Sequence, residues 1–194
     1  CDTRDLSQMQ EATQQASANL GPIDILVAAA GVMPVGPMCS ADPADWRQML
    51  ETNMLGVLHA VHSVLPGMLE RGTGHVVLLG SVAGRTLFPD ATVYCATKSA
   101  VHVIAEGLRS ELTRRRREDG NRIRVTLVAP GAVDTPLPQT ISDDQSRAAT
   151  TAWYEHMDGI LVPEDVAETI KWAIEAPEHV SVNEVVVRPS AMTR

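Results

Sequence analysis

The sequence is poor in the features that mark several classes of protein. Its three cysteines, Cys1, Cys39 and Cys95, are odd in number and show no CxxC spacing, which argues against a disulfide framework and for a reducing, cytoplasmic location. No apolar run reaches the roughly 18 residues that a membrane span needs, so no membrane partner is expected. The net charge of −8 argues against nucleic acid as a partner, because nucleic-acid-binding proteins present a basic face.

Two kinds of binding motif are also missing. The histidines form no HExxH motif and no Cys/His cluster, so we expect no metal site. No glycine-rich loop of the GxGxxG type, which would hold a pyrophosphate at a helix start, occurs before Gly31. Because the chain also opens on Cys rather than Met, we expect it to be the downstream part of a longer polypeptide.

The elements alternate along the chain. Apolar residues at helical spacing predict a helix over residues 6–19, and further helices are expected over residues 42–69, over 91–117 and from Pro163 onward. Apolar or Val-rich runs predict four strands, at Ile25–Ala30, residues 75–80, Ile123–Val128 and Glu184–Arg188. This alternation predicts one α/β domain over residues 1–194, with a doubly wound parallel sheet and helices on both faces.

Ser81, Tyr94 and Lys98 are the residues that point to a reaction. Tyr94 and Lys98 are four residues apart, so they share one face if residues 91–117 form a helix. A neighbouring ammonium and a helix start would both lower the pKa of the phenol from its usual value of about 10. The tyrosine could then exchange a proton with an alcohol or a carbonyl, while Ser81 hydrogen-bonds the same oxygen.

The ordered set of Ser81, Tyr94-Cys95-Ala96-Thr97-Lys98 and Pro130-Gly131 resembles the single-domain branch of the short-chain dehydrogenase/reductase family. YxxxK alone arises often by chance, but the set in this order, with a strand before the Pro-Gly pair, is specific. The resemblance implies a Rossmann-like fold whose first β-α-β portion is missing from this chain. It also implies NAD or NADP as the cofactor, with a preference for NADP.

The resemblance assigns four catalytic roles. Tyr94 is expected to be the general acid/base, Lys98 to lower its pKa and bind the nicotinamide ribose, and Ser81 to hold the substrate oxygen. Asn53 is expected to hold a water that links Lys98 to solvent. A plain solvent-facing asparagine is the alternative for Asn53, although Asn53-Met54-Leu55-Gly56 matches the NxxG motif of the family.

The resemblance also implies cofactor contacts at several strand ends. The expected contacts are Asp2, Thr3, Ala29, Ala30, Gly31, Tyr94, Lys98, Pro130, Gly131, Val133 and Thr135. Asp2 would bind the adenine amino group, although it could instead cap the following helix, as Asp5 or Ser7 could. Val133 and Thr135 would engage the nicotinamide carboxamide.

One motif departs from the family pattern. Ala28-Ala29-Ala30-Gly31 stands where the family has two asparagines before Ala-Gly, so the side chains that brace the sheet there are lost.

Residues 136–159 correspond to a mobile substrate lid in the family, while a plain surface helix is the alternative. Mostly apolar pocket walls are expected at Met33, Val35, Ser81–Ala83, Phe88, Val133, Trp153 and Met157.

Taken together, these features predict an oxidoreductase that transfers a hydride between a nicotinamide cofactor and a small alcohol or carbonyl substrate. Two alternatives stay open: epimerase or dehydratase chemistry on a nucleotide sugar, and a non-catalytic dinucleotide-binding regulatory protein. The helices expected at residues 42–69 and 91–117 carry apolar residues on more than one face, and relatives pair these helices, so we expect a homodimer or homotetramer. We do not expect residues 1–194 to function when expressed alone.

Overall fold

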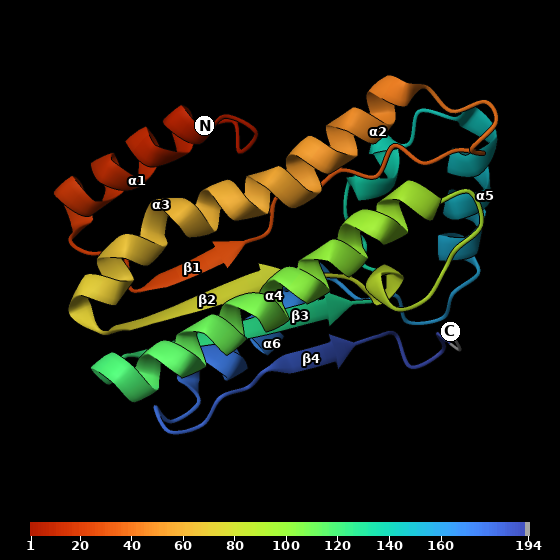
Figure 1. Ribbon diagram of the computed structural model, residues 1–194. Helices are drawn as coiled ribbons and strands as arrows, with labels where there is room; N and C mark the ends of the chain where they lie inside the picture. Colours follow the sequence, from red (N-terminus) through yellow and green to blue (C-terminus); the bar gives the residue numbers. More distant parts are fainter. Residues whose placement is uncertain (193–194) are drawn as a thin grey trace.

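A single parallel sheet organises the protein (Figure 1). The computed structural model describes residues 1–192. Its four strands are hydrogen-bonded in the order β1-β2-β3-β4, and every neighbouring pair is parallel. The strands are β1 Ile25–Ala28, β2 Thr73–Leu79, β3 Arg122–Pro130 and β4 Glu184–Val187. The predicted α/β class with a parallel sheet is therefore confirmed.

Helices cover both faces of the sheet, as predicted. In Figure 1, α1, α3 and α4 lie across one face, whereas α6 lies behind β3 and β4. The α-helices are α1 Leu6–Leu20, α2 Pro43–Leu50, α3 Gly56–Arg71, α4 Thr92–Asp119, α5 Asp144–Glu155 and α6 Pro163–Glu175. Two short 3-10 helices, η2 Val82–Gly84 and η3 Leu137–Thr140, lie in the loops that follow β2 and β3.

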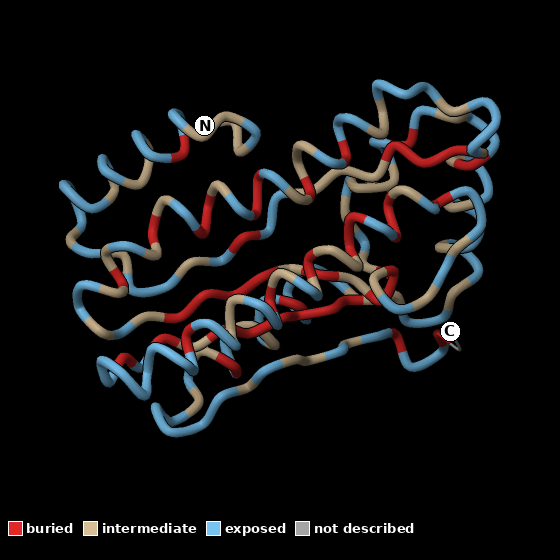
Figure 2. The backbone as a smooth tube through the Cα atoms, viewed as in Figure 1, coloured by how far each residue is buried: buried red, intermediate tan, exposed pale blue. Residues whose placement is uncertain are grey.

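The central strand β2 is apolar from Val76 to Leu79, and both of its faces are buried over most of this stretch (Figure 2). Val76 and Leu78 pack into the core under α3 and α4, while Val77, on the opposite face, packs against Val166 of α6. This alternation follows from the two-residue period of a strand. The two cores hold β2 in place, and with it the loop at its carboxyl end.

Strand β1 departs from the prediction. It ends at Ala28 rather than Ala30, and Ala29 and Ala30 continue as an exposed loop. Although the run is continuously apolar, Ile25 and Val27 are 43% and 40% exposed. Only Leu26 and Ala28 pack under the helices, so β1 is buried on one face.

The helix predicted over residues 42–69 contains an irregularity at a functional position. Glu51–Leu55 (η1) forms a turn of π-helix between α2 and α3, and Asn53 lies at its centre. Such turns inside an α-helix are frequent at functional sites because they displace a side chain from the regular helical register. The helix then continues past Pro66 to Arg71, so this proline does not end it.

A buried histidine lies inside the sheet. His75 on β2 is 3% exposed, and its Nε2 lies 2.8 Å from Thr126 Oγ1. Because the Thr126 hydroxyl donates to Val182 O at 2.7 Å, the histidine must donate through Nε2. Its Nδ1 is buried and has no hydrogen-bond partner among the described residues. Burial, followed by the charge of Arg124, lowers the pKa of His75 to about 4.

The buried His75 predicts that the folded protein loses stability at acid pH. The unfolded chain takes up a proton on His75 below about pH 6.5, whereas the folded protein does so only near pH 4. The stability that depends on neutral His75 is therefore present above about pH 6.5 and lost as the pH falls toward 4. We expect His75→Gln, which retains a donor to Thr126, to reduce this loss by on the order of 2 kcal/mol. Urea unfolding at pH 7, 5.5 and 4 measures it, and equal losses in both proteins would contradict it.

Candidate active site

The carboxyl ends of β1, β2 and β3 meet at one cavity of about 610 Å³. Open parallel sheets bind ligands at this edge because the loops that follow the strands converge there. The cavity is lined by residues that follow each of the three strands, by the start of α4, and by α5 and α6. Lys98 is the one charged residue among the side chains that line it.

The structure brings Ser81, Tyr94 and Lys98 together at this cavity. Tyr94 is the third residue of α4, so its side chain starts at the positive end of the helix dipole. Lys98 Nζ lies 5.9 Å from the centroid of the Tyr94 ring and donates to Leu79 O, at the end of β2, at 3.1 Å. Ser81 and Tyr94 both line the cavity, and the Ser81 hydroxyl accepts from Ala83 N at 3.1 Å. The side chains of the serine and the tyrosine therefore lie at the same cavity.

Burial changes the ionisation of this group. It raises the pKa of Tyr94 above its ordinary value, and the hydrogen bond from Ser81 offsets only part of that rise. Burial also lowers the pKa of Lys98 to about 8, because low-polarity surroundings disfavour its charged form. The prediction that the pKa of Tyr94 is lowered toward neutrality is therefore wrong. The phenol is held in its protonated form.

Asn53 braces the site through its side chain. It is 1% exposed, its Oδ1 accepts from Val32 N at 2.9 Å, and its Nδ2 donates to Val32 O at 2.9 Å and to Thr97 Oγ1 at 3.2 Å. The alternative of a solvent-facing asparagine is wrong. The expectation that Asn53 holds a water stays a prediction. Because both Nδ2 hydrogens are used by Val32 O and Thr97 Oγ1, such a contact would fall to another atom of the residue.

Thr97 and Gly31 contribute to the site in ways that the sequence analysis did not single out. Thr97, inside the YxxxK motif, is fully buried and donates to Tyr94 O at 2.8 Å, so it joins Asn53 to the start of α4. A Cβ on Gly31 would lie 3.4 Å from Asn53 Oδ1 and 3.7 Å from Lys98 Nζ, so Gly31 sits between these two side chains. The position of Thr97 inside the YxxxK motif could have singled it out from the sequence alone.

The predicted cofactor residues divide into two groups. The predicted cofactor residues that line the cavity are Ala29, Gly31, Tyr94, Lys98, Pro130, Gly131, Val133 and Thr135. Two of them, Val133 and Thr135, belong to the segment after β3, where Leu137 N donates to Thr135 Oγ1 at 3.3 Å. Asp2, Thr3 and Ala30 do not line it.

Asp2 and Thr3 lie where the chain enters α1. Arg4 binds the Asp2 carboxylate, with Nη2 at 2.6 Å from Oδ2, and holds the pKa of Asp2 at about 2. Asp5, not Asp2, caps α1 by accepting from the backbone N–H groups of Ser7 and Gln8. A Cβ on Gly56 would lie only 2.8 Å from Thr3 Oγ1, so the glycine of the NxxG motif lets this segment pack against α3.

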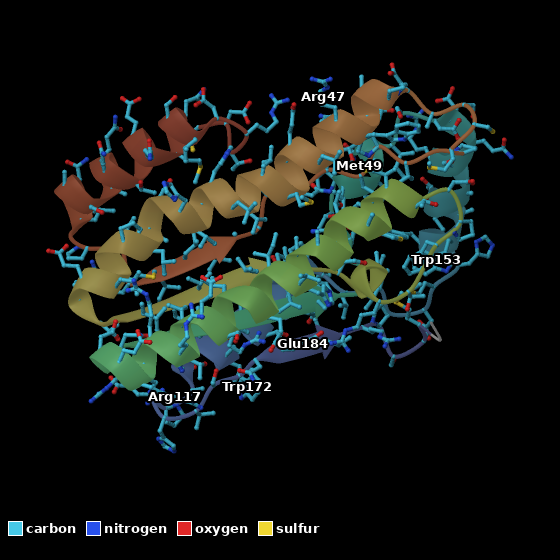
Figure 3. All side chains as sticks on the ribbon, viewed as in Figure 1. Arg47, Met49, Arg117, Trp153, Trp172 and Glu184 are labelled. Atoms are coloured by element: carbon cyan, nitrogen blue, oxygen red, sulfur yellow. The ribbon has the colours of Figure 1, made fainter. Side chains whose placement is uncertain are left out.

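Aromatic side chains form one wall of the cavity. Trp153 extends from α5 toward the loop before α4 (Figure 3), where its ring lies 6.1 Å from that of Phe88. The Tyr154 ring lies 5.4 Å from Trp153, and burial raises the pKa of Tyr154. The other predicted wall residues line the cavity, except Met157, whose place is taken by Tyr154. Residues 136–159 therefore cover the cavity instead of forming a plain surface helix, while their predicted mobility stays a prediction.

A family model described as short chain dehydrogenase matches residues 1–146. The chain belongs to this family. It is 39% identical over 180 residues to an uncharacterized oxidoreductase of Staphylococcus saprophyticus, and the match covers 93% of this chain and 70% of that protein. It is 40% identical over 190 residues to the glycine betaine reductase ATRR of Emericella nidulans, which covers 97% of this chain but 14% of that much longer protein.

Solved structures agree with this assignment. The closed form of a serine dehydrogenase complexed with NADP+ superposes with a TM-score of 0.88 at 33% identity, covering all of this chain and 75% of that one. The serine dehydrogenase of Escherichia coli gives a TM-score of 0.80 at 31% identity, with 76% of its chain covered. This short-chain dehydrogenase is thus an NAD(P)-dependent oxidoreductase that transfers a hydride between its cofactor and an alcohol or carbonyl group. The two alternative functions are not favoured.

We expect Asn53→Ala to destabilise this dehydrogenase strongly. The truncation would leave the Val32 N–H and C=O without their amide partner in a buried site, at a cost of about 2–4 kcal/mol. Asn19→Ala, the same change at an exposed position of α1, is the matched control and should cost less than about 1 kcal/mol. Denaturant unfolding followed by tryptophan fluorescence measures both, and equal losses would show that the buried amide does not brace the site.

Proposed function

We propose that this protein reduces a neutral, largely apolar ketone or aldehyde with NADPH, and that Tyr94 supplies the proton. The observation that carries the proposal is the shared position of the Ser81 and Tyr94 hydroxyls beside Lys98 at the cavity. Burial keeps Tyr94 protonated, which is the form that an acid catalyst of carbonyl reduction needs. Ser81 donates a hydrogen bond to the same carbonyl oxygen.

The cavity fits a nicotinamide cofactor beside these residues. When bound, the cofactor supplies the hydride. Gly31 and Gly131 line the cavity after β1 and β3, and a Cβ on Gly131 would meet Met192 Sδ at 2.7 Å, so this glycine makes room for Met192. We propose that Lys98 binds the ribose through its ammonium group. The Thr135 hydroxyl accepts from Leu137 N and so keeps its own hydrogen available for a carboxamide oxygen.

At the other end of the cofactor, we propose that its adenosine half contacts Asp2, Thr3, Ala29 and Ala30. Arg4 keeps the Asp2 carboxylate ionised, and an ionised carboxylate can accept from an adenine amino group while paired, because its oxygens offer about four acceptor positions. The preference for NADP rests on the similar solved structures, several of which contain NADP. Residues 1–194 are proposed to act as one NAD(P)-binding domain.

The lining of the cavity supports an uncharged substrate. Phe88, Trp153 and Tyr154 form an aromatic wall, and Met33 and Val35 add apolar surface. A substrate carboxylate would need an arginine or a second lysine, because an unpaired charge is costly in an apolar cavity. Lys98 is the one cation among the lining residues and already donates to Leu79 O. These observations favour an aryl or cyclic carbonyl compound over a hydroxy or amino acid.

Two further proposals concern the state of the protein in the cell. Apolar side chains on the helical segments that relatives pair are partly or largely exposed, at 44% for Leu50, 42% for Leu55, 39% for Leu58 and 71% for Val103, which supports a homodimer or homotetramer. Within the described residues, no helix has the length and apolarity needed to cross a membrane. The three free cysteines support a cytoplasmic location.

We expect Tyr94→Phe to abolish turnover. The change removes the acidic hydrogen but keeps the ring, so kcat should fall by roughly 10²–10⁴-fold. The affinity for NADPH should stay within about twofold, since Lys98 and the strand ends remain in place. Stopped-flow absorbance at 340 nm with the full-length protein measures the rate, and cofactor fluorescence measures binding. Turnover near that of the unmodified enzyme would remove Tyr94 from the mechanism.

We expect Trp153→Ala to weaken the binding of aryl ketones selectively. Loss of the indole removes one side of the aromatic wall, so KM for an aryl ketone should rise by roughly tenfold, with a smaller change for acetone. Trp172→Ala, on α6 and 60% exposed, is the matched control and should leave both KM values unchanged. Efficient turnover of serine or a hydroxy acid by the unmodified enzyme, with none of aryl ketones, would refute the proposed substrate class.

A further inference from the structure

His102 contacts the backbone of the catalytic serine and is not among the residues that line the cavity. It lies on α4 at the same four-residue interval that separates Tyr94 from Lys98, so the three side chains follow one face of the helix. Its Nε2 lies 3.1 Å from the carbonyl oxygen of Ser81. A carbonyl can only accept, so Nε2 carries the hydrogen and donates it. The catalytic helix therefore holds the backbone of the residue that bonds the substrate oxygen.

Two glycines make room for this ring. A Cβ on Gly84 would lie 2.5 Å from His102 Nε2, and one on Gly80 would lie 3.1 Å from the same atom. These glycines flank Ser81, at the end of β2 and the end of η2. The imidazole thus fills a slot that the loop leaves open on both sides of the serine, which explains why glycine is needed at Gly84 although its backbone shows no positive φ.

A carboxylate on β4 stands behind the ring. Glu184 Oε1 lies 3.8 Å from His102 Nδ1, is buried, and has no hydrogen-bond partner among the described residues. The other oxygen, Oε2, pairs with Arg85, which follows η2. The pair of Glu184 and Arg85 therefore joins β4 to the serine loop, while Oε1 faces the free nitrogen of the imidazole.

We propose that His102 is a positioning residue for the reaction. His102 fixes the Ser81 peptide, and through it the direction in which the Ser81 hydroxyl points. Since Ser81 and Tyr94 line the same cavity, a rotation of the Ser81 peptide would separate the two groups that must reach one carbonyl oxygen. The inference rests on the proposed roles of Ser81 and Tyr94.

Single variants of the full-length enzyme test the geometry. In His102→Ala, kcat for the carbonyl substrate should fall roughly tenfold, whereas the Kd for NADPH should stay unchanged, because the loss is confined to the serine loop. His102→Gln, whose amide carries a donor near the position of Nε2, should recover part of kcat, and the shorter His102→Asn should not. His62→Ala, at an exposed position of α3, is the matched control and should be silent.

A double-mutant cycle separates positioning from general destabilisation. If His102 acts through Ser81, its removal should not lower kcat further once Ser81→Ala is present. Equal fold-losses in both backgrounds, or an unchanged kcat in His102→Ala, would overturn the inference. Should His102→Ala fail to fold, His102→Asn in the same cycle decides, with the same loss of kcat expected only while Ser81 is present. An inactive Tyr94→Phe beside a fully active His102→Ala would refute this inference alone, whereas a fully active Tyr94→Phe would refute the proposed function.

Discussion

The buried amide of Asn53 is the interaction on which the site depends. It joins the loop after β1 to the start of α4 by bonding both backbone groups of Val32 and the hydroxyl of Thr97. Lys98 adds a second tie, from α4 to the end of β2. Because a parallel sheet leaves its strand ends connected only by loops, such side-chain ties decide whether groups from different strands meet at one point. The π-helical turn places the amide where it can make them.

Burial at this edge opposes ionisation of both Tyr94 and Lys98. The two effects suit a proton transfer, since neither group is held strongly as an ion and each can change state when charge develops nearby. Oxidation of an alcohol would need the phenolate, and the positive charge of an oxidised nicotinamide is the kind of neighbour that favours it. Reduction needs only the neutral phenol that the protein already provides. The direction of the reaction is therefore part of the proposal that Tyr94 acts as the acid.

Sequence reasoning predicted the parts of the fold that depend on periodicity. It gave four parallel strands and every α-helix that covers the sheet, because apolar spacing records burial directly. It also paired Tyr94 with Lys98, since their spacing is a property of one helix. It failed where the outcome depends on contacts between distant segments. The bonding of Asn53 to Val32 and the net effect of burial on Tyr94 involve surroundings that no local pattern contains.

The distribution of aromatic residues argues that the cavity wall has a role beyond packing. The protein has six aromatic side chains, and four of them, Phe88, Tyr94, Trp153 and Tyr154, line one cavity. The main core cluster under α3 and α4 is built from Met, Ala, Val, Leu and Ile. Tyr94 and Phe88 belong to a second core cluster beside the cavity, so packing accounts for part of this arrangement. Trp153 is 41% exposed and buries less of its ring, so stability explains its position least. Its place on the wall supports the proposed contact with a substrate.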